Sequence, residues 1–353
     1  MIVLGLFDGH SGGQLAFDDL GITFDGEKDI YFASEIDKYA MAVTQYHYPN
    51  TIQIGDITKV RYENGVLYSE KGQWEVDIDM VIGGSPCTGF SMAGKGLNFD
   101  DPRSKLFFDF TRLIDEIKPT YFMLENVKMK KEWLDTITEY MGVEPIFINS
   151  RLVSAQNRQR YYWTNIPNVT IPDDLNITWG DIREMGVNAQ NFYYTEKAMQ
   201  WLGRHSQRKN KTLKVHNNDD KMQMIEASHY KKYSSQRFFG IVDRPDTDVY
   251  DIYSNNDELE FQHTPKGIDI VTNDNIVSRF IVSNVVPPNK LHLRYITPLE
   301  CERCQTVPDN ATLWGNFDGV VKQVSNSQRY KMLGNGWTMK VISHIFSFIP
   351  EVK

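Results

Sequence analysis

The segment GGSPCTGFS, residues 83–91, places Cys87 directly after a proline in a run of small residues. It follows Met80, Val81 and Ile82, an apolar run typical of a buried strand, so the cysteine falls where a loop should begin. A thiol in such a loop can ionise and act as a nucleophile. The alternative is a small buried side chain with no chemical role, which is the commoner state of a free cysteine.

Three other expected strand ends carry residues suited to chemistry. The first apolar run leads into the glycine-rich turn DGHSGG, residues 8–13, the second ends at Glu35, and a later one runs into Glu125. A glycine-rich turn followed by an acid after the second strand is typical of adenosine cofactor sites. The turn lacks the G-x-G-x-x-G spacing, which disfavours a nicotinamide dinucleotide relative to S-adenosylmethionine.

The elements that must position these residues alternate between strand and helix over residues 1–165. Strands are expected at residues 2–7, 30–33, 79–82, 121–124 and 145–148, with a β-ribbon over 160–163. Apolar residues at three- and four-residue steps predict a helix capped by Ser104 and ended by Pro119, and Asp37 should cap an earlier helix. This alternation predicts an α/β fold, a parallel sheet with helices on both faces, whose carboxyl edge gathers the strand ends.

The pattern changes near Pro167. From there to about residue 291 the chain is polar and weakly periodic, which indicates a smaller, irregular second domain. Helical patterning returns after Pro298, with helices expected around 299–303, 328–333 and 341–349. We therefore expect three parts, residues 1–167, 168–290 and 291–353.

The composition limits the possible classes of protein but does not identify the function. The 353 residues are 41% hydrophobic and 24% charged, which is ordinary for a globular protein. Three cysteines cannot make a disulfide framework, so a reducing, cytoplasmic compartment is expected. The first residues have neither the basic region of a signal peptide nor the length of a membrane span.

The net charge of −8 argues weakly against a nucleic-acid partner, but charge acts locally. Residues 201–240 hold nine Lys or Arg and three Asp or Glu, a local charge of +6. A solvated surface is the ordinary explanation for such a stretch, and a phosphate-binding surface is the alternative.

Nine segments in order resemble the motifs of the DNA cytosine-5 methyltransferase family, over nearly the whole chain. They are FDGHSGG, SEIDKYA, GDIT, GGSPCTGFS, DPRSKLFFDF, LENV, SAQNRQRYYW, RYITPLECERCQTVPD and NSQRYKMLGNGWTM. Each is weak alone, and their ordered recurrence makes the resemblance specific. It implies a Rossmann-like, S-adenosylmethionine-dependent α/β sheet, a target recognition domain at 168–290, and a C-terminal segment that returns to the catalytic domain.

The resemblance also implies a catalytic group. Cys87 would be the nucleophile, and Glu125 would bind the cytosine ring at N3 and the exocyclic amine. Arg160 would contact the base carbonyl, with Arg158 in support. Thiolate addition at C6 would make C5 nucleophilic enough to take a methyl group, and the base would have to be flipped out of the duplex.

A cofactor pocket is implied in the same way, with Glu35 on the ribose hydroxyls and Asp56 on the adenine amino group. The implied cofactor-binding residues are Phe7, Asp8, Gly9, Gly12, Glu35, Ile36, Asp56, Ile57, Ser85, Pro86, Asn335 and Trp337. The expected partner is double-stranded DNA, contacted by Thr88, Ser91, Arg204, Arg208, Lys209, Lys211 and Arg237. We expect a monomer that uses no metal and no membrane and acts at DNA in a bacterial or phage-infected cell.

The resemblance is to bacterial and phage members, with three departures. Asp8 stands where many bacterial members have Ala, and Trp337 stands where a small aliphatic residue is usual; both lean toward the animal de novo branch. Thr88 replaces a common Gln at a position that can fill the gap left by a flipped base.

Two other readings of the whole chain stay open: a tRNA cytosine-5 methyltransferase on the same scaffold, and a catalytically inactive DNA-binding homologue. The long basic segment favours DNA over tRNA.

Cys301 and Cys304 form a C-x-x-C pair without a second pair of ligands, so buried cysteines are expected rather than a zinc or redox site. His10 is expected to be a loop histidine with no special task, and a catalytic role is the alternative.

Overall fold

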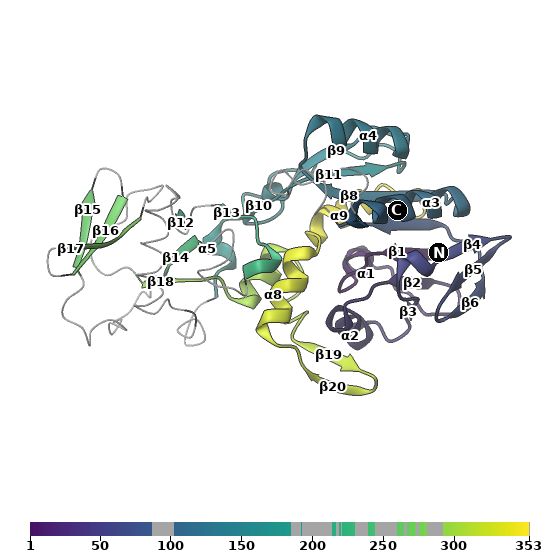
Figure 1. Ribbon diagram of the computed structural model, residues 1–353, viewed down its shortest axis with the longest axis horizontal. Helices are drawn as coiled ribbons and strands as arrows, with labels where there is room; N and C mark the ends of the chain where they lie inside the picture. The colour runs from purple at the N-terminus through teal and green to yellow at the C-terminus, as the bar shows by residue number, and fades with distance from the viewer. Residues whose placement is uncertain are drawn as a thin grey trace.

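A computed structural model describes residues 1–86, 102–184, 192, 214–216, 219, 221–229, 239–243, 260–264, 267–272, 275–280 and 292–352 (Figure 1). Its main feature is one seven-stranded sheet in the order β3-β2-β1-β7-β8-β11-β9. These strands are β1 (Ile2–Leu6), β2 (Ile30–Ser34), β3 (Ile52–Gln53), β7 (Met80–Gly83), β8 (Tyr121–Val127), β9 (Ile146–Asn149) and β11 (Gln159–Thr164).

The sheet is mixed, which corrects the expectation of a wholly parallel one. The first five strands in spatial order are parallel, but β11 pairs antiparallel with both β8 and β9. After β3 the chain returns to β7 on the other side of β1, so the strand order reverses between β1 and β7. Ligands bind in open α/β sheets at this point, beyond the carboxyl ends of the strands.

Both faces of the sheet are buried, because alternate strand residues enter two separate cores. On β7, Met80 and Ile82 pack into one core and Val81 into the other. On β8, Met123 faces the first core and Leu124 the second. Burial on two sides explains why these strands read as continuous apolar runs in the sequence.

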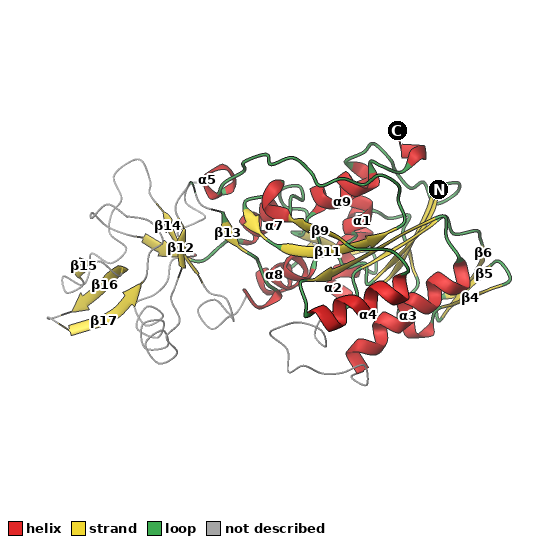
Figure 2. Cartoon of the chain, turned by 90° about the horizontal axis from the view of Figure 1, so that it is seen from above, coloured by secondary structure: helices red, strands yellow, loops and turns green. Residues whose placement is uncertain are grey.

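Helices cover the two faces (Figure 2). α3 (Pro102–Ile117) and α4 (Lys131–Met141) pack on the second core, while α1 (Gly12–Asp18), α2 (Lys38–His47) and α9 (Met339–Phe346) contribute to the first. Asp37 caps α2 as predicted, since its carboxylate accepts from the Tyr39 amide at 2.9 Å. The predicted cap at Ser104 is wrong, because α3 already begins at Pro102. Proline suits a first helical turn, where its missing N–H is not needed.

The C-terminal segment is part of the first core. It contains α7 (Pro298–Cys304), the hairpin β19 (Trp314–Phe317) and β20 (Val320–Gln323), α8 (Asn326–Asn335), α9 and a last short turn, Pro350–Val352. Phe346 of α9 stacks on Phe17 of α1, with ring centroids 4.6 Å apart. Ser343 donates to the Ala16 carbonyl at 3.3 Å. The predicted helices of this segment are confirmed in type, with bounds shifted by a few residues.

Short strands complete the described chain. A meander joins β4 (Arg61–Glu63), β5 (Val66–Ser69) and β6 (Gly72–Glu75) beside the main sheet. In the middle part, β12 (Lys214–His216), β14 (Phe239–Asp243) and β18 (His292–Arg294) form one small sheet, and β15 (Glu260–Thr264), β16 (Gly267–Thr272) and β17 (Asn275–Phe280) form another (Figure 1). β10 (Gln156–Asn157) pairs with β13 (Met222–Gln223), and α5 (Trp179–Ile182) lies near α7. The expected boundaries at 167 and 290 stay predictions.

No helix within the described ranges is long and apolar enough to cross a membrane.

The packing of α9 predicts that the C-terminus is needed for stability. We expect Phe346→Ala to lower the free energy of unfolding by about 3–5 kcal/mol, because it opens a cavity between α1 and α9. Lys340→Ala on the same helix removes only a partly exposed ion pair with Asp19 and should lower it by less than about 1 kcal/mol. Urea denaturation measures both, and equal small losses would show that α9 is not part of the core.

Candidate active site

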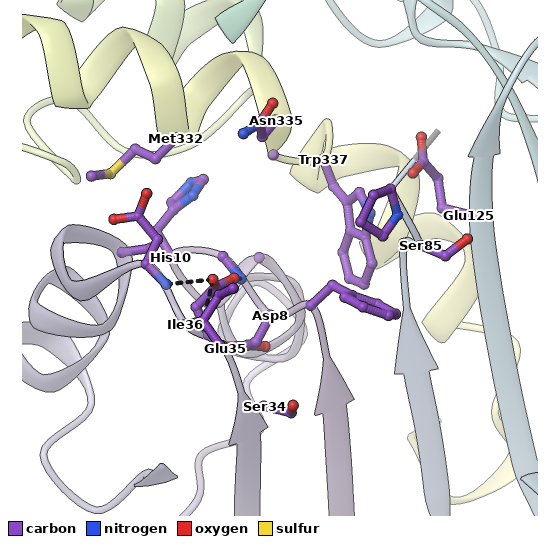
Figure 3. Close-up of a pocket in the computed structure, with 18 of the residues that line it drawn as sticks. Asp8, His10, Ser34, Glu35, Ile36, Ser85, Glu125, Met332, Asn335 and Trp337 are labelled. Atoms are coloured by element: carbon purple, nitrogen blue, oxygen red, sulfur yellow. Dashed lines mark hydrogen bonds between the residues drawn. The ribbon is translucent and has the colours of Figure 1, made fainter. Parts of the chain in front are cut away.

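A cavity of about 410 Å³ opens at the carboxyl edge of the sheet, where the strand order reverses (Figure 3). Its walls come from the ends of β1, β2, β7 and β8, the turn before Ile57, and the turn between α8 and α9. Segments as distant as Phe7 and Trp337 therefore line one space.

The turn after β1 adopts an uncommon backbone conformation. Phe7, Gly9 and Ser11 all have left-handed dihedrals, with φ of 56°, 61° and 60°. Glycine adopts this region freely, but Phe and Ser do so at a cost in free energy, so surrounding contacts must hold the turn. One such contact is the Asp8 amide, which donates to the Ser34 carbonyl of β2 at 3.2 Å.

Asp8 is the centre of a buried polar network beneath this turn. Its carboxylate accepts from the Tyr31 hydroxyl at 2.6 Å and from Ser11 Oγ at 2.5 Å. Ser11 Oγ in turn accepts from Gln14 Nε2 at 3.0 Å. Gly5 is required beside it, since a Cβ there would lie 2.5 Å from Asp8 Oδ1.

Burial controls the protonation of Asp8. It raises the pKa of the carboxyl to about 7, although the hydrogen bonds from Ser11 and Tyr31 favour the ionised form and oppose this. The negative charge of Glu35 adds a smaller upward effect. Near neutral pH, Asp8 is therefore divided between its acid and its carboxylate.

Glu35 is held rigidly at the end of β2. Its Oε1 accepts from the amides of Ile36 and Asp37 at 2.7 and 2.8 Å, and its Oε2 accepts from the Gly9 amide at 2.9 Å. A carboxylate has about four lone-pair sites, so Oε2 keeps capacity for a ligand hydroxyl. Asp56 lies nearby, where one carboxylate oxygen accepts from the Thr58 amide at 2.9 Å.

Glu125 and Arg160 form an ion pair on the opposite wall. They lie on the same face of β8 and β11, in diagonal positions of the antiparallel ladder, since Glu125 is directly opposite Tyr162. Arg160 Nε is 2.5 Å from Glu125 Oε1, and the two side chains are only 8% and 11% exposed. Arg160 Nη1 also approaches Met224 Sδ at 3.2 Å.

Arg158 reaches a different set of atoms. Its guanidinium donates to the backbone carbonyls of Gly336 at 2.8 Å and of Ile225 at 3.2 Å, and makes longer bonds of 3.4 Å to Gly334. These bonds fasten the α8–α9 turn and residues 221–229 to the sheet. They favour a positioning role for Arg158.

Trp337 stands between two glycines that leave room for it. A Cβ on Gly84 would lie 2.8 Å from Trp337 Nε1 and 3.0 Å from Glu125 Oε2. A Cβ on Gly12 would contact the other side of the indole at 3.5 Å. The C-terminal turn thereby closes over both the β1 turn and Glu125.

The structure gathers the described part of the predicted site into this one cavity. All twelve predicted cofactor-binding residues line it, together with Glu125, Arg158 and Arg160. The other predicted site residues lie outside the described residues. They are Cys87, Thr88, Ser91, Arg204, Arg208, Lys209, Lys211 and Arg237. The burial of His10 in the cavity wall and the contacts of residues 221–229 were not anticipated.

The cysteine pair of α7 is buried as predicted, and burial raises the pKa of both thiols. In the part of the chain that the structure describes, no three His, Cys, Asp or Glu side chains form a group that could hold a metal.

The strand order, the antiparallel β11 and the cavity at the reversal point define a Rossmann-like methyltransferase fold. Solved structures share it at low sequence identity. The Entamoeba histolytica methyltransferase EhMeth has a TM-score of 0.65 at 14% identity, covering 99% of this chain and 98% of that one. S. pombe Dnmt2 methyltransferase has a TM-score of 0.60, also at 14% identity, covering 99% and 98%.

The comparison of amino-acid sequences shows to which family the chain belongs. Residues 1–351 match the family model of C-5 cytosine-specific DNA methylases, and the chain belongs to that family of enzymes. The type II methyltransferase M1.ScrFI of Lactococcus lactis subsp. cremoris is 28% identical over 99% of this chain and 78% of its own length. M.NgoBV of Neisseria gonorrhoeae is 32% identical, but that match spans only 46% of this chain and 40% of the relative.

The burial of Asp8 predicts a pH dependence of stability. A carboxyl whose pKa is raised on folding stabilises the native state only while protonated, so this contribution fades as pH rises from about 4 to about 7. Over that range, wild type should lose up to roughly 4 kcal/mol of unfolding free energy relative to Asp8→Asn.

Urea denaturation of the two proteins across this pH range measures the difference, and contributions from other titrating groups cancel in it. Parallel curves would show that Asp8 is ionised throughout in the native protein.

Proposed function

We propose that this protein transfers a methyl group from S-adenosylmethionine to C5 of a flipped-out cytosine in a specific duplex DNA sequence. Family membership supports methylation of cytosine in DNA. The observation that carries the finer proposal is that one cavity contains both the Glu125–Arg160 pair and the carboxylate of Glu35. A base-binding group and a ribose-binding group are thus within reach of one another.

The walls of the cavity fit the proposed cofactor. Oε2 of Glu35 can accept from a ribose hydroxyl, and Asp56 can accept from the adenine amino group. Phe7, Ile36 and Ile57 supply apolar surface on the same side. When bound there, S-adenosylmethionine supplies an electrophilic methyl group on a sulfonium.

Glu125 and Arg160 are the proposed partners of the cytosine. The ring N3 and exocyclic amine face Glu125, and the ring carbonyl faces Arg160. A preformed pair of this kind stabilises the charge that develops on the ring as it is attacked. Arg158 does not share this role in the proposal, because its donors are already directed to backbone carbonyls.

Cys87 is the proposed nucleophile. Its thiolate adds to C6 of the cytosine, electron density moves to C5, and C5 bonds to the methyl carbon. The bond between that carbon and the sulfonium sulfur breaks at the same time, its electron pair stays on sulfur, and S-adenosylhomocysteine leaves. Loss of the C5 proton and departure of the thiolate then restore the aromatic ring. One difficult substitution is thereby divided into easier steps.

Base flipping follows from the depth of the site. The carboxyl of Glu125 is nearly covered by protein, and a base that stays stacked in a duplex cannot reach it. Thr88 and Ser91 are proposed to contact the DNA near the extruded base. The basic residues between 201 and 240 are proposed to contact phosphates, within a recognition region at about 168–290. We further propose that the enzyme acts as a monomer in the cytoplasm.

Expression in a host without DNA methylation tests the proposal. Base-resolution conversion sequencing of the host DNA should show 5-methylcytosine within one short sequence motif for the wild type. Cys87→Ala should reduce methylation at that motif by at least about a thousandfold, because it removes the covalent step. The purified variant should still bind S-adenosylmethionine with nearly the wild-type affinity, measured by calorimetry.

Substrate controls separate the alternatives. The pure wild-type protein is assayed with duplex DNA carrying the motif and with tRNA. Equal or preferential methylation of tRNA would contradict the DNA assignment, and no methylation of either by a folded protein that binds the cofactor would favour an inactive homologue. Full turnover by Cys87→Ala would overturn the nucleophile assignment.

A further inference from the structure

Residues 221–229 belong to the proposed recognition region but pack against the catalytic part of the chain. Their strand β13 pairs in parallel with β10, just before Arg158 and Arg160 (Figure 1). Met224 Sδ lies 3.2 Å from Nη1 of Arg160, the proposed partner of the base carbonyl. The next residue, Ile225, is 1% exposed and is part of the first core. A piece of the recognition region therefore lies directly beside the base site.

The backbone of Ile225 is held from both sides. Its carbonyl accepts from Arg158 Nη1 at 3.2 Å, and its amide donates to Gln156 Oε1, also at 3.2 Å. Arg158 Nη2 in turn donates to the Gly336 carbonyl at 2.8 Å, and Gly336 is part of the cavity wall. Arg158 is therefore one connection between the recognition region and the cofactor cavity.

Two buried glutamines form a second connection between the same two points. Gln156 Nε2 donates to Gln305 Oε1 at 2.9 Å, and Gln305 Nε2 donates to the Gly336 carbonyl at 3.0 Å. Both side chains are 0% exposed. We call this series of hydrogen bonds, from Ile225 through Gln156 and Gln305 to Gly336, the glutamine relay.

The amide groups of the relay use all their donors. Gln156 Nε2 also donates to the Cys304 carbonyl at 2.6 Å, and Gln305 Nε2 also donates to the Leu333 carbonyl at 2.6 Å. Gln305 Oε1 accepts a second bond from Thr338 Oγ1 at 2.9 Å. Turning over either amide would set oxygen against oxygen, so each amide fixes the orientation of the other. A network of this kind defines one arrangement of the segments that it joins.

Close packing adds to this constraint where α8 meets residues 221–229. A Cβ on Gly334 would lie 2.0 Å from the Ala227 amide nitrogen and 2.1 Å from the carbonyl carbon of Glu226. Only glycine lets the two backbones approach so closely. Because a packed interior of this density does not absorb displacements, a shift of one backbone moves the other.

We propose that Gln156 and Gln305 are positioning residues for methyl transfer, which hold residues 221–229 and the α8–α9 turn in the one arrangement that binds DNA and cofactor together. This inference rests on the proposed function. DNA that fixes Ile225 favours the cofactor-binding position of Gly336, and the cofactor favours the DNA-binding position of Ile225. By linkage, each ligand raises the affinity for the other by the same factor.

The binding of both ligands tests the proposal. Calorimetry measures the affinity for S-adenosylhomocysteine of the free protein and of the protein saturated with duplex DNA that carries the motif recovered by sequencing. For wild type we expect the DNA to raise this affinity about tenfold, within the usual range for coupled sites. Gln156→Met and Gln305→Met should each lower this coupling factor to about threefold or less, because only Arg158 then joins Ile225 to Gly336.

The coupling factor separates positioning from general stability. A loss of cofactor affinity that is the same with and without DNA leaves the factor unchanged. Ser154→Ala is the matched control, because Ser154 is also 0% exposed and its hydroxyl donates to the Cys304 carbonyl at 2.5 Å. No hydrogen bond among the described residues links Ser154 to Ile225 or Gly336, so this variant should keep the wild-type factor.

Two more variants examine the relay itself. The double variant with Gln156→Met and Gln305→Met should have the same coupling factor as either single variant, because both substitutions break one series of bonds. Gln156→Glu serves if a methionine is not accommodated, since it has the shape of glutamine. Its carboxylate still accepts from the Ile225 amide but no longer donates to Gln305, so the factor should fall to the same extent.

An unchanged coupling factor in the glutamine variants would overturn this inference, and so would an equal loss in Ser154→Ala or a larger loss in the double variant. A wild type that binds both ligands with a factor of one would also overturn it, while leaving the proposed function standing. Failure of the wild type to bind S-adenosylhomocysteine or the duplex at all would overturn the proposed function, and this inference with it.

Discussion

The arrangement of the site depends on the buried ion pair between Glu125 and Arg160. Removing either charge would leave the other buried without compensation, so the two strands that carry them must stay in register. β11 supplies Arg160 because it runs antiparallel beside β8, which sets the arginine diagonally across from the glutamate. The antiparallel direction of β11 beside β8 therefore places Arg160 where the proposed chemistry at this edge of the sheet requires it.

A second constraint acts on the other side of the cavity. The Asp8 network holds a strained turn against β2, and that turn presents Gly9 to Glu35 and His10 to the cavity. The C-terminal segment closes the space from above, with Arg158 fastening its backbone. Three regions far apart in the sequence thus meet at one ligand-sized cavity. α9 packs in the first core and directly follows the turn that closes the cavity, so the same helix contributes to stability and positions the site.

Much of the fold could be predicted from the sequence, because the local patterns of its strands and helix caps are strong. Buried strands such as β1 and β7 read as continuous apolar runs, and the cap at Asp37 needs only one residue and its neighbours. The β4–β5–β6 meander also has a local pattern in the sequence, because the Asn64-Gly65 dipeptide between β4 and β5 favours a tight hairpin turn. The direction of β11 and the contacts of residues 221–229 depend on tertiary pairing, which no local pattern reports. The burial of the His10 ring in the cavity wall likewise depends on the packing of distant segments, here the β1 turn and the end of α8.

The central claim is a transient bond between the Cys87 sulfur and C6 of an extruded cytosine. It is tested most directly by incubating the protein with S-adenosylmethionine and duplex DNA that carries 5-fluorocytosine at the target position, followed by digestion and mass spectrometry. Fluorine cannot leave C5 as a proton does, so the account predicts a stable methylated adduct attached through Cys87. Methylation of the ordinary sequence without any adduct at residue 87 on the fluorinated one would contradict it.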